Sequence, residues 1–193
     1  MRRALGVVLA ALLGAAPVAM AAAGAGDPER RAAESRKVVR AFMQALKKEL
    51  KGAMEKGGPV RAIAVCRERA PAIAQRFSKE TGWEVGRTSL RYRNPANAPD
   101  AWERRVLESF EARRRAGEPA ARLEHYEVTP RDGRRVFRYM KAIPTGPVCL
   151  ACHGERLAPE VTRALDRHYP GDRARGFRVG DIRGAFTIVQ PLD

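Results

Sequence analysis

The sequence predicts an α+β fold in which helices from the front of the chain pack on an antiparallel sheet from its second half. Three observations predict it: apolar side chains recur at helical spacing between residues 29 and 77, short alternating segments flank a turn at residues 130–133, and a final strand-like segment covers residues 182–190. Helices grouped ahead of strands favour α+β over an alternating α/β fold. With 193 residues, 45% of them hydrophobic and 31% charged, the chain fits one globular domain rather than a disordered or membrane-embedded protein.

Two helices are predicted at the front of the domain. The first spans residues 29–54, and its apolar side chains lie on one face: Val39, Phe42, Met43, Leu46 and Leu50. Gly57, Gly58 and Pro59 end it. The second repeats the pattern at Ile63, Cys66, Ala70, Ile73 and Phe77, with Pro71 expected to kink or divide it. We expect the first helix to belong to the core, with a homodimer contact as the alternative.

The rest of the chain predicts a sheet with two further helices. Residues 83–92 are strand-like, and residues 93–99 form a loop rich in proline and asparagine. Asp100 and Glu103 make a capping box for a helix that carries Val106, Leu107 and Phe110. Residues 123–129 and 135–143 predict a hairpin across the turn at 130–133. A short helix at 159–168 and a closing strand at 182–190 complete the prediction.

The first 23 residues predict an export signal, which leaves residues 24–193 as the mature domain. Arg2 and Arg3 precede an apolar run at residues 5–16, and small side chains follow at Ala19, Ala21 and Ala23. The apolar run is shorter than the roughly 20 residues that a spanning helix needs. We therefore expect cleavage, a periplasmic location and no stable membrane span afterwards.

The chain is strongly basic, with 37 Lys and Arg against 22 Asp and Glu and a formal net charge of +15. A basic domain can bind nucleic acid, anionic lipid or an acidic protein, but export separates this chain from most nucleic acid. Because the arginines are scattered, a solvated basic surface and a docking surface for an acidic redox partner are both expected alternatives.

One motif carries chemistry that the composition does not explain. Cys149, Leu150, Ala151, Cys152 and His153 form C-x-x-C-H, the attachment motif for c-type haem. Two cysteines three apart can bond the two vinyl groups of one haem, and the following histidine can then bind the iron. The motif predicts one covalent haem c on Cys149 and Cys152, with His153 as an axial iron ligand. A redox C-x-x-C would need a thioredoxin-like βαβ setting, and zinc would need a second pair of ligands.

Cys66 is then the third cysteine, and its role is open from spacing alone. Two interpretations remain: a buried inert thiol on an apolar helix face, or a second axial ligand held as thiolate by the iron. Competing candidates for that position are His125, His168, Met140 and Met43.

Four sequence blocks resemble a bacterial c-type haem family with a PAS-like fold. The blocks are AIAVCRERAP, GWEVGRTSLRYRNPANAPDAWE, CLACHG and YPGDRARGFRVGDIRGAF. The family is known as stand-alone exported proteins and as sensor regions of histidine kinases, and the resemblance runs from about residue 38 onward. It implies a PAS-like antiparallel sheet covered by the N-terminal helices. It also implies that Cys66 binds the haem iron opposite His153.

The second of these blocks contains the predicted propionate contacts. Arg87, Thr88, Arg91 and Asn94 are the candidates, and the alternative is that Arg87 and Asn94 organise a turn, as Asn-Pro segments often do.

A histidine and thiolate pair is expected to favour ferric iron and to give a low reduction potential. We therefore expect a redox-responsive or electron-transferring protein rather than an enzyme. One alternative is a sensor in which nitric oxide or carbon monoxide displaces Cys66 after reduction. The other is a peroxidase-like enzyme, for which His125 is the candidate distal base.

Overall fold

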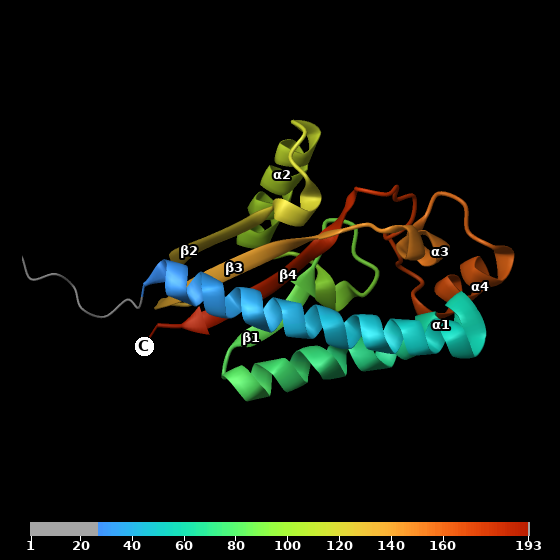
Figure 1. The fold of residues 1–193 in the computed structure, drawn as a ribbon, viewed down its shortest axis with the longest axis horizontal. Helices are drawn as coiled ribbons and strands as arrows, with labels where there is room; N and C mark the ends of the chain where they lie inside the picture. Colours follow the sequence, from blue (N-terminus) through green and yellow to red (C-terminus); the bar gives the residue numbers. More distant parts are fainter. Residues whose placement is uncertain (1–26, 193) are drawn as a thin grey trace, which may run out of the picture.

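In the computed structural model, which describes residues 27–192, a four-stranded antiparallel sheet lies between two layers of helix (Figure 1). The predicted export signal lies outside the described residues. The helices are α1 (Pro28–Thr81), α2 (Ala101–Arg115), α3 (Leu150–His153) and α4 (Pro159–His168), with 3-10 turns η1 (Pro95–Asn97), η2 (Ala120–Arg122) and η3 (Pro147–Cys149). The strands are β1 (Glu84–Thr88), β2 (Glu124–Arg131), β3 (Arg134–Pro144) and β4 (Ile182–Pro191).

The sheet has the order β1-β4-β3-β2, and every neighbouring pair is antiparallel. The predicted α+β fold, with N-terminal helices on an antiparallel sheet, is confirmed and is compatible with a PAS-like fold. No helix within residues 27–192 combines the length and apolar character that crossing a membrane requires.

α1 is a helical hairpin. Figure 1 shows its two halves running back along each other, from blue to cyan and then into green. The reversal lies at Gly57 and Gly58, the two residues inside α1 with non-helical backbone angles. Gly58 has φ 64° and ψ −161°, a conformation that side chains with a Cβ disfavour. The predicted helix break is therefore confirmed.

Pro71 does not divide the second half of α1, and this part of the prediction is wrong. The backbone stays helical through Pro71. Proline removes the hydrogen bond to the carbonyl four residues earlier, at Arg67. Both residues are exposed, so water can satisfy that carbonyl.

Each face of the sheet buries a separate hydrophobic cluster. On one face, α1 contributes Phe42, whose ring lies 5.6 Å from that of Phe77 and 5.3 Å from that of Phe186 on β4. On the other face, α2 buries Trp102, Val106, Leu107 and Phe110 against residues that include Met140. Consecutive residues such as Tyr139 and Met140 lie in opposite clusters because side chains alternate along a strand.

The local start and turn signals were predicted well. Both hydrogen bonds of the α2 capping box form: Glu103 N donates to Asp100 Oδ1 (2.8 Å), and Asp100 N donates to Glu103 Oε2 (3.1 Å). The β2–β3 hairpin closes through Asp132 and Gly133, with φ 53° and 77°. Two successive positive φ values are typical of a tight type I′ turn. The turn is shorter than expected, since Pro130 and Arg131 already pair within the ladder.

β1 is shorter than the predicted strand at residues 83–92. It ends at Thr88 because the chain turns there, and Ser89 N donates to the carbonyl of Asn97 (3.1 Å) rather than to a strand. The segment after β1 is therefore free to run towards α3 and α4.

A third cluster joins the tip of the α1 hairpin to α4. Ile63 of α1 packs with Val161, Ala164 and Leu165 of α4, and Cys152, Leu157 and Tyr169 lie against them. Figure 1 shows α3 and α4 at this end of the molecule. The C-x-x-C-H motif is thereby held against α1.

A charge cluster ties α1 to the sheet and gives a first prediction. Glu124 on β2 accepts hydrogen bonds from Arg36 (2.6 Å) and from the hydroxyl of Tyr139 (2.8 Å). Burial alone would raise the pKa of Glu124, but these hydrogen bonds outweigh it and lower the pKa below its ordinary 4.5. Glu124→Gln should reduce the free energy of unfolding at pH 7 by about 1–3 kcal/mol.

The difference in the free energy of unfolding between the wild type and Glu124→Gln should shrink as pH falls below 4.5. A group with a lowered pKa stabilises the fold only while its carboxylate is ionised. Urea unfolding at several pH values measures it. Glu118→Gln, which breaks a surface pair with Arg113, is the control and should cost less. A pH-independent difference for Glu124→Gln would contradict the assignment.

Candidate functional site

The C-x-x-C-H motif forms one compact helical turn. Cys149 ends η3, and α3 carries Cys152 and His153. Gly154 N closes the turn by donating to Leu150 O (3.0 Å). A Cβ at Gly154 would lie 2.6 Å from that oxygen, so this position requires glycine. Because the cysteines are three positions apart, along about one helical turn, their side chains project from the same side.

The loop before β4 fixes the imidazole of His153. Its Nδ1 lies 2.7 Å from the carbonyl oxygen of Ala174, which can only accept, so Nδ1 carries the proton and Nε2 has the free lone pair. Two backbone bonds join the same segments: Gly176 N to Gly154 O (2.9 Å) and Phe177 N to His153 O (2.9 Å). Burial, followed by the cations Arg183 and Arg93, holds the pKa of His153 well below its ordinary range. His153 is therefore a neutral imidazole whose Nε2 can bind a metal.

Arg183 lies over the face of this imidazole. Its Nε is 3.2 Å from Nδ1 and 3.4 Å from Nε2 of His153. A bond along either lone pair would leave the other nitrogen much further away, so we interpret the contact as stacking rather than as a hydrogen bond. The guanidinium also donates to Ser89 Oγ (3.3 Å) and to the carbonyl of Arg91 (3.3 Å). Burial, followed by repulsion from Arg93 and Arg87, lowers the pKa of Arg183 to about 9.

Cys66 comes to the same site from α1. It lies one helical turn after Ile63, which packs in the cluster with Cys152 and Tyr169. Burial raises the pKa of the Cys66 thiol, while the nearby cations Arg87 and Arg93 oppose that effect. Arg87 and Arg93 also act on His153, so the structure brings Cys66 and the C-x-x-C-H turn into one neighbourhood.

The site carries more positive charge than its own acids neutralise. Arg93 pairs with Asp172 (3.1 Å), but neither Arg87 nor Arg183 forms an ion pair with any residue in the described range 27–192. Arg87 lies on β1, and burial lowers its pKa. Unpaired, partly buried guanidinium groups are costly unless an anion meets them. The site therefore suits a ligand with carboxylate groups.

The other predicted propionate contacts are placed less favourably. Thr88 is buried and donates to the carbonyl of Asn97 (3.4 Å). The side chain of Asn94 accepts from Ala96 N (3.0 Å) and caps η1, which matches the alternative turn role. Arg91 is exposed, with its guanidinium carbon 4.1 Å from the centre of the Phe177 ring.

The rival axial ligands lie mostly elsewhere. Met140 is buried in the cluster under α2, and Met43 packs between α1 and the sheet. The ring of His125 lies 5.7 Å from that of Trp102. His168 lies nearer, since its Nδ1 contacts Arg67 Nη1 (3.2 Å) beside Cys66. The part of the chain that the structure describes contains no group of three or more His, Cys, Asp or Glu that could hold a metal ion unaided.

Sequence reasoning missed Arg93, Arg183, Asp172 and Ala174. Arg93 was assigned to a loop, and the other three lie in the quoted block YPGDRARGFRVGDIRGAF without a role. The unusual density of arginine and aspartate in that block was the available signal.

Comparison with known proteins places this arrangement in a family. A family model described as Tll0287-like matches residues 25–191. The chain belongs to the Tll0287-like family. The resemblance of the four sequence blocks to a haem-binding family is thus confirmed, and the PAS-like fold that it implied is compatible with the structure.

One solved structure supports the assignment. The present chain is similar to that structure, the cyanobacterial heme-protein Tll0287, with 25% sequence identity and a TM-score of 0.65. The match covers 87% of this chain and 98% of that chain. No curated protein matches the chain.

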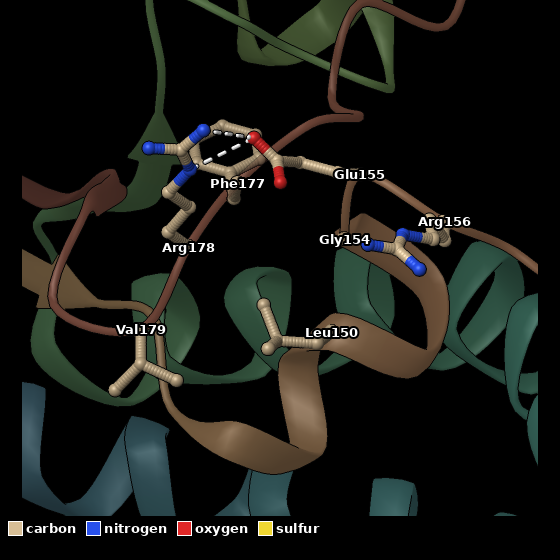
Figure 2. A pocket seen from close by; sticks show the side chains of 7 residues that line it. All are labelled: Leu150, Gly154, Glu155, Arg156, Phe177, Arg178 and Val179. Carbon is tan, nitrogen blue, oxygen red and sulfur yellow. Dashed lines mark hydrogen bonds and ion pairs between the residues drawn. The ribbon is translucent and has the colours of Figure 1, made fainter.

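The outer side of the motif faces a shallow, open hollow. Figure 2 shows its lining: Leu150, Gly154, Glu155, Arg156, Phe177, Arg178 and Val179. Arg178 and Glu155 form an ion pair on one side of it, beside Phe177 (2.8 Å). Val179 in this lining is 59% exposed, so the hollow of the Tll0287-like domain has an apolar side chain open to solvent beside its charged ones.

A close contact between β1 and β4 yields a prediction about the position of Arg183. A Cβ on Gly184 would lie 2.4 Å from Thr88 O, and φ at Gly184 is 154°. Gly184→Ala should therefore push the strands apart, displace Arg183 and cost about 1–3 kcal/mol of stability. Gly86→Ala is the control, since its Cβ would make an ordinary 3.5 Å contact with Thr187. Thermal unfolding compares them, and equal stability of the two variants would show that the contact is not tight.

Proposed function

We propose that this chain is an exported c-type haem protein that carries one haem on Cys149 and Cys152 and acts in electron transfer or redox response. The observation that carries the proposal is the C-x-x-C-H turn with the Nε2 of His153 left free by the bond to Ala174. Membership of a family with a haem-protein structure supports haem binding. The predicted signal at residues 1–23 supports a periplasmic location, where c-type haem is attached.

The residues of the site fit such a group. Cys149 and Cys152 would supply the thioether sulfurs, and His153 and Cys66 would hold the iron. Arg87 and Arg183 supply cations for the propionate carboxylates, with Arg91 at the surface. When bound, haem supplies an iron that gains and loses one electron.

A thiolate from Cys66 would give the bound haem a low reduction potential. Its negative charge stabilises ferric iron, whereas the cations Arg87 and Arg183 oppose part of this effect. Burial favours the neutral thiol of Cys66, so this residue stays ionised only while a metal holds it. A change in metal charge is thereby linked to the packing of α1, which is the basis for a redox response.

The arrangement supports this role over catalysis. His125, the candidate distal base of a peroxidase, packs against Trp102 in the α2 layer. Two protein ligands would also fill both axial positions. We therefore propose no enzymatic turnover.

The redox partner is an acidic electron-carrier protein that docks at the hollow of Figure 2. The exposed Val179 provides an apolar contact, and Arg156 provides a cation without an ion pair in the described residues. This surface adjoins the attachment cysteines, so it offers a short path to the metal.

Haem attachment is tested directly by mass spectrometry of the protein made with a cytochrome maturation system. The mature chain should gain the mass of one haem, bonded to the peptide containing Cys149 and Cys152. Cys149→Ser should leave a single thioether and a shifted pyridine haemochrome band, whereas Cys66→Ser should leave attachment intact. Unmodified thiols at Cys149 and Cys152 would refute the proposal.

The role of Cys66 is tested by electron paramagnetic resonance of the ferric protein beside Cys66→Ala. The wild type should show a low-spin thiolate signal that the variant lacks. Met43→Ala is the control for a packing defect in α1. Identical wild-type and Cys66→Ala spectra would reject Cys66 as a ligand. Carbon monoxide added to the reduced wild type should leave the Soret band unchanged, and a shift would favour the gas-sensor alternative.

Docking is tested with ferricyanide as an anionic electron acceptor. Its rate of oxidation of the reduced protein should fall as ionic strength rises, because screening weakens attraction to a basic surface. Arg156→Glu should slow the reaction at low salt more than Arg135→Glu, which makes the same charge change in the β2–β3 hairpin. Equal effects of the two substitutions would place the approach site elsewhere.

A further inference from the structure

The carbonyl that holds His153 has a second donor. Ala174 O accepts from His153 Nδ1 (2.7 Å) and from Arg93 Nη2 (3.2 Å). The same nitrogen of Arg93 donates to the carbonyl of Cys152 (2.6 Å). One guanidinium therefore joins the backbone of the attachment turn to the backbone that orients the imidazole.

Arg93 is itself held by a buried carboxylate. Asp172 accepts from Arg93 Nε (3.1 Å) and from Ala174 N (2.9 Å) through Oδ1, and from Arg175 Nε (2.9 Å) through Oδ2. The side chains of Arg93 and Asp172 are 11% and 1% exposed. The pair is therefore rigid and shielded from solvent, where a charge acts more strongly than at the surface.

We propose that Arg93 and Asp172 are positioning residues that limit the negative charge His153 can acquire and so set its strength as a ligand. This inference rests on the proposed function, in which Nε2 of His153 binds haem iron. It adds a residue pair that tunes that ligand.

The pair limits the negative charge on His153 because the Asp172 carboxylate is separated from the His153 imidazole. A carboxylate bonded directly to Nδ1–H draws the proton away and makes the imidazole more anionic and more strongly donating. Here three donors occupy Asp172, and a backbone carbonyl stands between it and His153. That carbonyl is also shared with a cation, which makes it a weaker acceptor for Nδ1–H. This limits how strongly the bond at Nδ1 polarises the imidazole of His153.

Opposite charges in the pair predict opposite shifts in potential, which a packing defect would not produce. Arg93→Gln removes a cation near the iron and weakens the limit on His153, so the reduction potential of the haem protein should fall. Asp172→Asn removes an anion and leaves Arg93 uncompensated, so the potential should rise. Arg93→Lys keeps the charge and should stay near the wild type. Spectroelectrochemistry measures all four proteins.

Electron paramagnetic resonance of the ferric proteins adds a second readout. The low-spin g values should shift in Arg93→Gln, because a more anionic imidazole binds iron more strongly. Arg138→Gln is the matched control: Arg138 is buried and paired with Asp100 on the α2 face, so the substitution should reduce stability without moving the potential or the g values.

Shifts of the same sign in Arg93→Gln and Asp172→Asn, or none in either, would overturn the inference while leaving haem attachment intact. Arg93→Gln could fail to accumulate as folded protein. In that case, a raised potential in Asp172→Asn together with an unchanged potential in Arg93→Lys supports the inference. Any other result for Asp172→Asn overturns the inference. A wild-type protein without covalent haem would overturn the proposed function as well.

Discussion

The hydrogen bond from His153 to the carbonyl of Ala174 is the contact on which the geometry of the site depends. Alone, the single helical turn of α3 could not fix an imidazole, because such short helices are marginal without tertiary support. The loop that leads into β4 supplies that support through Ala174, Gly176 and Phe177. β4 is an interior strand of the sheet, so the loop that orients Nε2 is anchored to a strand paired on both sides.

The electrostatics of the site follow from that arrangement. Three arginines converge near His153, and Asp172 is the acid that pairs with one of them. A protein retains uncompensated buried cations only where something offsets their desolvation, and carboxylates or a thiolate would do so. The same cations limit how far a thiolate could lower a redox potential. In the proposed haem protein, the site would therefore combine a strong anionic donor with a field that opposes it.

Local signals in the sequence predicted much of the fold. The capping box of Asp100 and Glu103, the break at Gly57 and Gly58 and the helix at residues 159–168 depend on neighbouring residues, so spacing reveals them. The end of β1 and the effect of Pro71 depend on tertiary contacts and solvent exposure, which spacing does not contain.

In the candidate site, too, the residues that sequence predicted belong to local motifs, and the others depend on distant contacts. C-x-x-C-H is a local motif, and the resemblance to the family linked Cys66 to it. The contacts of Arg93 and Arg183 join residues 30 to 94 positions apart in the chain, so periodicity could not reveal them. Asn94 was a plausible anion contact in sequence, but its side chain caps η1.

The account depends most on Cys66 and His153 binding one iron from opposite sides. Iron K-edge X-ray absorption of the ferric wild-type protein measures this directly. We predict a first shell with one sulfur beside five nitrogens, four from the porphyrin and one from His153. A shell of nitrogen or oxygen alone, with no sulfur, would contradict it.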